Sequence, residues 1–206
     1  MARPRSSGAA FSESRSLENL ARIREIQGRA VTAFMASILR RQRLTLLCGQ
    51  VLWMGCLLCG ILFADLKSQP VHVAPKKPGV ELFADVLTNN CSIAAVAFSG
   101  VVTFGLGAVA VSLFAGLSGG LFMAHAYALG AGPFARTVLP HAVLELPAFG
   151  VAIAAGLVPA TTLVRSLLAG RKARISESLV DAAALLGLSL AMLVVAACVE
   201  TWVSTR

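Results

Sequence analysis

The sequence predicts an all-α protein, a polytopic membrane helix bundle of about five transmembrane helices. Of its 206 residues, 57% are hydrophobic and only 14% are charged, and the mean hydropathy is +0.78. Soluble domains carry about 25% charged residues. Several stretches of about 20 residues are uncharged or nearly so, which is long enough to cross ~30 Å of hydrocarbon. Most of the chain is therefore expected to lie within the bilayer.

The apolar stretches divide the chain into a polar tail and a membrane domain. Residues 1–43 are expected to form a basic cytoplasmic tail with an amphipathic helix, and residues 44–206 the transmembrane domain. The predicted spans are 44–64, 86–114, 117–134, 139–164 and 179–203. A turn between the second and third spans is expected at residues 115–120, in the sequence AGLSGG. The fourth span contains two prolines and is expected to be kinked.

The basic residues predict the orientation. Nine of the 18 Lys and Arg residues lie in residues 1–43 and four lie between the fourth and fifth spans, against five in the segments on the other side. Cytoplasmic loops carry the excess of Lys and Arg. With five spans, both basic segments fall on the same side, so the N-terminus is expected in the cytoplasm. The net charge of +8 then reflects orientation, and no nucleic-acid partner is predicted.

The basic tail is interpreted in two parts. Residues 1–16 are small, polar and basic, and are expected to be disordered. The apolar positions that follow recur at spacings close to three and four, namely Leu20, Ile23, Val31, Phe34 and Ile38. A basic amphipathic helix beside a membrane can lie on anionic headgroups or the protein's own core, and it can equally pack on a partner protein.

Small residues in the spans are interpreted mainly as packing residues. Cys56 and Cys59 form a C-x-x-C pattern, but without a thioredoxin-like context cysteine in a lipid helix acts as a small apolar residue. Glycine allows membrane helices to approach closely. The glycines assigned to helix packing are Gly100, Gly105, Gly107, Gly116 and Gly120. A pore lined by these small residues is the alternative.

The stretch LPHAVLELPAFG, residues 139–150, carries the candidate site. His141 and Glu145 are four residues apart, so they share one face of a helix. A carboxylate inside the bilayer costs free energy unless it is paired with another group or in contact with water. Pro140 suits the first helical turn, whereas Pro147 leaves a carbonyl without its usual donor. The motif therefore predicts a bent helix that presents two polar groups to the bundle interior.

Three functions remain open for His141 and Glu145. They form a structural clamp between helices, or part of a transport or ion path, or part of a metal-dependent catalytic centre with His125 as a third ligand. The chain contains neither H-E-x-x-H nor G-x-S-x-G. No enzymatic activity, cofactor or resident metal is predicted, and an intramembrane metal-dependent enzyme is the weakest alternative.

The same stretch resembles the proline–histidine–glycine and glutamate–leucine signature of the stage II sporulation protein M family of bacterial membrane proteins. The preceding FADVLTNNCSIAAVAFSGVVTFGLGAV is similar to that family's asparagine-pair and glycine-rich segment. The family pattern falls on Asn89, Asn90, Pro140, His141, Glu145 and Leu146. One departure is Ala142, where the family usually has glycine.

The resemblance implies a non-enzymatic, multi-pass component of a multiprotein complex in a bacterial inner membrane. Such a component would be a scaffold or a permease-like subunit, whereas an independent transporter or channel is the alternative function. The implied partners are lipid, other membrane proteins such as an ATPase or ABC-type export system, and further copies of this chain.

Overall fold

The computed structural model describes residues 7–65 and 77–204. The chain divides into two compact units, Met1–Arg41 and Gln42–Arg206. All the described elements are helical, and five helices are long and apolar enough to cross a membrane. The prediction of an all-α polytopic bundle is therefore confirmed.

The first unit is one helix, α1 (Ser7–Arg41). Residues 7–16 are thus helical, in contrast to the expected disorder, because this stretch contains no proline or glycine except Gly8 and continues the helix that follows; residues 1–6 lie outside the described part. Ile26, Val31 and Phe34 are 60%, 62% and 47% exposed. The helix therefore exposes these three large apolar side chains, whereas Ile38 of the predicted apolar face is buried.

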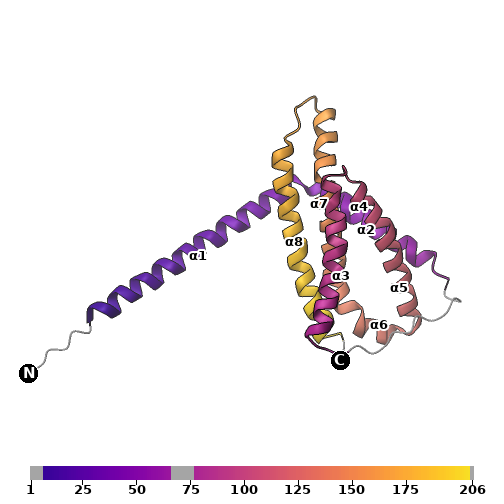
Figure 1. The fold of residues 1–206 in the computed structure, drawn as a ribbon, viewed down its shortest axis with the longest axis horizontal. Helices are drawn as coiled ribbons and strands as arrows, with labels where there is room; N and C mark the ends of the chain where they lie inside the picture. Colours follow the sequence, from indigo (N-terminus) through magenta and orange to yellow (C-terminus); the bar gives the residue numbers. More distant parts are fainter. Residues whose placement is uncertain (1–6, 66–76, 205–206) are drawn as a thin grey trace, which may run out of the picture. The chain divides into compact units, whose positions relative to one another are not determined.

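The second unit is a bundle of α-helices (Figure 1). Its elements are α2 (Arg43–Leu62), α3 (Val80–Phe98), η1 (Ser99–Val101), α4 (Leu106–Val111), η2 (Ser112–Gly116), α5 (Leu117–Ala128), α6 (Ala131–Thr137), α7 (Leu139–Leu168) and α8 (Ile175–Trp202). The candidate spans are Arg43–Leu62, Val80–Val101, Leu106–Ala128, Leu139–Leu168 and Ile175–Trp202.

The turn between the second and third spans lies earlier than the sequence suggested. The chain reverses after η1, where Phe104 and Gly105 have φ angles of 49° and 91° and the Gly105 amide donates to the Gly100 carbonyl at 2.7 Å. The expected turn at residues 115–120 is wrong, because that stretch is helical through η2 and α5. Its glycines, which resemble turn residues in sequence, instead allow a helix contact.

Helix α7 is the central element. In the most apolar stretch of α7, 61% of the residues are buried, whereas 17–33% are buried in the corresponding stretches of the other four spans. The helix contacts α2, α3 and α8. The fully buried positions of its middle turns are Ala148, Ala152, Ile153, Ala154, Ala155 and Val158. Phe149 packs on Trp53 of α2 with ring centroids 5.1 Å apart. The core of the bundle is therefore built around one alanine-rich helix.

Close helix approach depends on glycine pairs. Gly120 of α5 faces the backbone of Gly60 and Leu57 in α2, and Gly100 faces the backbone of Gly156. A side chain at either position would collide with backbone atoms. The neighbouring Gly119 has nothing within 4 Å of where a Cβ would lie, so adjacent glycines differ in role.

The other predicted packing glycines lie at three different kinds of contact. Gly116 meets Cys56 and Trp53 of α2, whereas Gly107 lies against Ser99 and Gly100 within its own hairpin. Gly105 combines its positive φ with a contact to the Leu157 side chain. Among the predicted packing glycines, Gly116 and Gly120 therefore mediate the contact between α2 and the third span.

Helix α7 runs without interruption through Pro147 and Pro159. Pro140 occupies its first turn, where a missing N–H does no harm. The interior prolines cannot donate to the carbonyls of Val143 and Ala155. A lateral hydrogen bond also joins this helix to α8, because the Ser189 hydroxyl donates to the Ala148 carbonyl at 2.8 Å.

Candidate functional site

His141 and Glu145 lie on the inward face of α7, one helical turn apart. Their side chains are only 14% and 19% exposed, and His141 Nε2 lies 3.9 Å from a Glu145 carboxylate oxygen. Because both residues belong to the same helix, this pair alone joins no two helices. Any clamp must therefore involve groups from neighbouring elements.

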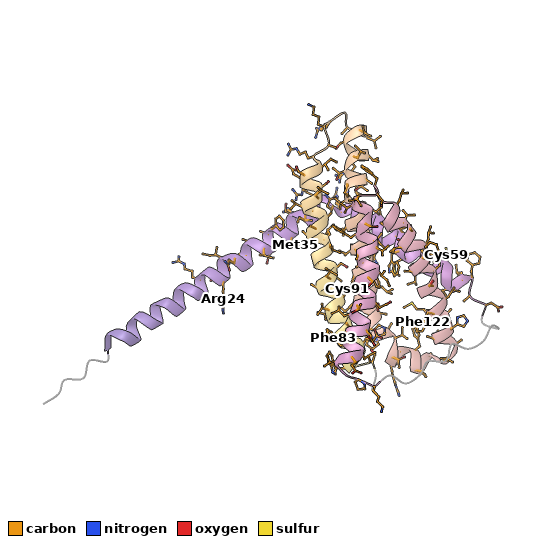
Figure 2. The ribbon with its side chains drawn as sticks, viewed as in Figure 1. Arg24, Met35, Cys59, Phe83, Cys91 and Phe122 are labelled. Carbon is orange, nitrogen blue, oxygen red and sulfur yellow. The ribbon has the colours of Figure 1, made fainter. Side chains whose placement is uncertain are left out.

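Those groups come from the last turns of α8 and from the residues just after it. The Nδ1 atom of His141 lies 3.2 Å from the Ser204 hydroxyl, just beyond the end of α8. Glu200 lies beside the pair, so that one ligand atom from each of His141, Glu145 and Glu200 lies within 4.8 Å of the other two. We call these three residues the His141 cluster. Phe83, labelled in Figure 2, packs on Trp202 in the same turns of α8, with ring centroids 5.5 Å apart.

Helix α3 closes the cluster with an asparagine pair. Asn90 is only 4% exposed, and its side chain lies near the Glu145 carboxyl group. Asn89 donates to Asn90 Oδ1 at 3.3 Å, whereas the buried Asn90 Nδ2 has no hydrogen-bond partner. The two asparagines and the histidine–glutamate motif, about 50 residues apart in sequence, therefore meet at one site.

The cluster concentrates negative charge in a poorly solvated place. Two ionised carboxylates 4.8 Å apart or less repel each other by about 3.5 kcal/mol or more at an effective dielectric constant of about 20. The Ser204 hydroxyl, the His141 ring and the Asn90 amide are the polar groups identified around them. A cation bound between Glu145 and Glu200 would offset that repulsion.

A cavity of about 920 Å³ lies next to the cluster and shares Glu200 as a wall. Its other polar lining residues include Glu81, Asp85, Asn89 and Lys77. The described lining residues hold three carboxylates and one ammonium, so their combined charge is negative. It is an approach through which a cation could reach Glu200.

His125 does not belong to the His141 cluster. Its Nδ1 atom lies 2.8 Å from the Leu121 carbonyl of its own helix, and the third potential ligand is Glu200 instead. The expectation that His125 joins the pair was therefore wrong. The sequence signal for Glu200 was an acidic residue in the final turns of an otherwise apolar span.

A second buried polar cluster lies elsewhere in the bundle and was missed by the sequence motifs. Gln42 donates to Asp181 at 2.8 Å, and the Thr45 hydroxyl lies 3.1 Å from Gln42 Oε1 and 2.9 Å from the Thr161 hydroxyl. Asp181 is only 3% exposed. These contacts join α2, α7 and α8.

The fold and the intramembrane polar site define a multi-pass, all-α membrane protein. The chain matches the Stage II sporulation protein M family over residues 50–205, which is about three quarters of its length, and it belongs to that family. Neither a curated protein nor a solved structure matches it. The match extends well beyond the motif stretch and includes α8, which carries Glu200, and Ser204 just after it.

The residues mapped from the family pattern mostly converge. Asn90, His141 and Glu145 face one another, and Asn89 bonds to Asn90. Ala142, the departure from the pattern, is 4% exposed and packs with Ala126 and Val138. Its methyl group is accommodated in a small apolar contact beside the site.

Proposed function

We propose that this chain is a non-enzymatic component of a multiprotein membrane complex, a scaffold or permease-like subunit in a bacterial inner membrane. Membership of the family and the five membrane-spanning helices support a membrane protein of this kind. The proposed orientation, with α1 in the cytoplasm, follows the distribution of Lys and Arg. In that orientation the His141 cluster lies near the outer surface.

One structural observation favours a scaffold over a transporter or channel. On α7, Glu145 of the His141 cluster and Thr161 of the second polar cluster are 16 residues apart, or about 24 Å along a helix. The core positions between them include Ala148, Ala152, Ile153 and Val158, which are fully buried. A packed and mostly apolar layer, in which Ser189 bonds to the Ala148 carbonyl, lies between the two polar clusters and favours a structural role.

The exposed apolar side chains of α1 support a role that involves partners. Ile26, Val31 and Phe34 are exposed on a helix that also carries Arg22, Arg24 and Arg29. Such a helix suits either anionic lipid or an acidic partner surface.

An independent transporter or channel is the second candidate, favoured by the negatively lined cavity beside three ionisable groups. Ionisable residues within spans often mark ion pathways. Conduction would require the apolar layer around Ile153 to open. The two candidates therefore differ in what the isolated chain can do.

Reconstitution separates the two candidates. The purified chain in liposomes should show no flux of ions or small solutes, and the full chain should retain defined partners from native membranes in mild detergent. Triple substitution of Ile26, Val31 and Phe34 by serine should release those partners, whereas Thr32→Ala on the same helix should not. Flux by the isolated chain that Glu145→Gln abolishes would overturn the scaffold proposal.

A further inference from the structure

We infer that the His141 cluster binds a single divalent transition-metal cation of the zinc type, which links α7 to α8. The inference does not depend on whether the chain is a scaffold or a transporter. It rests on three possible ligands from two helices: the His141 imidazole and the Glu145 and Glu200 carboxylates.

The geometry is close to that of a metal site. Zinc bonds to His nitrogen and carboxylate oxygen at about 2.0–2.2 Å, which places tetrahedral ligand atoms about 3.3–3.6 Å apart. His141 Nε2 and the Glu145 oxygen are 3.9 Å apart, and all three ligand atoms lie within 4.8 Å of one another. Side-chain rotations that move each atom by about 1 Å would close the site around an ion. Three protein ligands leave a fourth position for water or for a group from another molecule.

The surroundings of the ligands also match those of metal sites. A histidine that binds a metal through one nitrogen usually donates the other N–H to a fixed partner. Here Nδ1 lies 3.2 Å from the buried Ser204 hydroxyl, which orients Nε2 toward Glu145. Asn90 is buried, lies near Glu145 and keeps an unpartnered amide nitrogen. Such a group can orient a carboxylate that ligates a metal.

Charge and ligand type identify the class of cation. A divalent ion neutralises two carboxylates, which removes their mutual repulsion inside the bundle. An imidazole ligand favours zinc, cobalt or nickel over magnesium and calcium, which prefer sites made only of oxygen. The cavity beside Glu200, lined also by Glu81 and Asp85, gives the ion a negatively charged approach.

The test is zinc binding by the full-length protein, purified in detergent and stripped with a chelator. Competition with a zinc-binding dye should give one site per chain that excess magnesium does not occupy. Glu200→Gln, which keeps the side-chain volume, and His141→Ala should each weaken zinc binding by about 100-fold. His125→Ala and Glu177→Gln, a histidine and a carboxylate outside both the cluster and the cavity, should bind zinc as the wild type does.

Cobalt provides a spectroscopic readout on the wild-type protein itself. The wild-type cobalt complex should show absorption bands of nitrogen and oxygen coordination, without an intense thiolate band, and Cys56→Ala/Cys59→Ala should keep them. A thiolate band, loss of binding in that cysteine variant, or absence of saturable binding would overturn the inference. Unchanged zinc affinity in both Glu200→Gln and His141→Ala would overturn it as well.

Discussion

The Nδ1 atom of His141 lies 3.2 Å from the Ser204 hydroxyl oxygen, which connects the first turn of α7 to the residues that follow α8. The two residues are 63 positions apart in sequence. This contact turns the local histidine–glutamate pair into a connection between helices, since Glu145 extends toward Asn90 of α3 on the same face. The motif of α7 thus holds three helices at one end of the bundle.

Removal of the Ser204 hydroxyl tests that connection. Ser204→Ala should lower the free energy of unfolding by about 0.6 kcal/mol, the average for hydrogen bonds between membrane helices, and by no more than about 1.7 kcal/mol. The control is Ser92→Ala, because the Ser92 hydroxyl bonds only to the Thr88 carbonyl of its own helix. Thermal unfolding in detergent measures both. Equal effects would show that the link between the helices adds no stability.

Substitutions of Glu145 distinguish a clamp from an ion path. In the presence of a chelator, Glu145→Ala should destabilise the protein more than Glu145→Gln, because the amide keeps a hydrogen-bonding group at the same reach. The expected cost of the alanine variant is about 1–3 kcal/mol. The double variant with His141→Ala should be strongly non-additive in unfolding measurements. Additive costs, together with loss of function in the stable Gln variant, would contradict the clamp.

Adjacent glycines of α5 should respond in opposite ways to a methyl group. Gly120→Ala should destabilise the bundle by about 1–3 kcal/mol, because the new Cβ would collide with the backbone of Leu57 and Gly60 in α2. Gly119→Ala meets no neighbouring atom and should be neutral or stabilising by up to about 1 kcal/mol. Denaturant unfolding of the two variants provides the comparison. A neutral Gly120→Ala would contradict the close approach of α2 and α5.

The buried contact between Gln42 and Asp181 should contribute to stability independently of the His141 cluster. Gln42→Met keeps the side-chain length but removes the donor at 2.8 Å from the Asp181 carboxylate, and should cost about 1–3 kcal/mol. Its effect should add to that of Ser204→Ala, since the two sites share no residue. Non-additive unfolding energies would reveal coupling between the two ends of the bundle.

The proposed orientation can be tested with single reporter cysteines in a variant without the five native ones. Cysteines at Thr32 and Ser176 should react only with a reagent in the cytoplasm, and one at Thr137 only with a reagent outside. All three positions are exposed. Labelling of Thr32 and Thr137 from the same side would contradict a topology with an odd number of spans between them.

The sequence by itself determined the fold class. An apolar run long enough to cross a bilayer must satisfy its backbone groups internally, so it forms a helix whatever its neighbours are. Composition and run length therefore predicted the five helices, and the i, i+4 spacing of His141 and Glu145 placed both on one face. The family resemblance added Asn89 and Asn90, which no spacing argument connects to α7.

Only the tertiary structure decided where the chain reverses and what the polar motif meets. Glycine suits both a turn and a close helix contact, and local sequence does not distinguish these roles. Residues 115–120 therefore appeared to be a turn, whereas the reversal occurs at Phe104 and Gly105. Glu200 and Ser204 reach His141 because α8 packs antiparallel along α7, a long-range contact set by the shapes of whole helices. The sequence offered His125 only as one possible third ligand, whereas the packing of α7 against α8 places Glu200 beside His141 and Glu145.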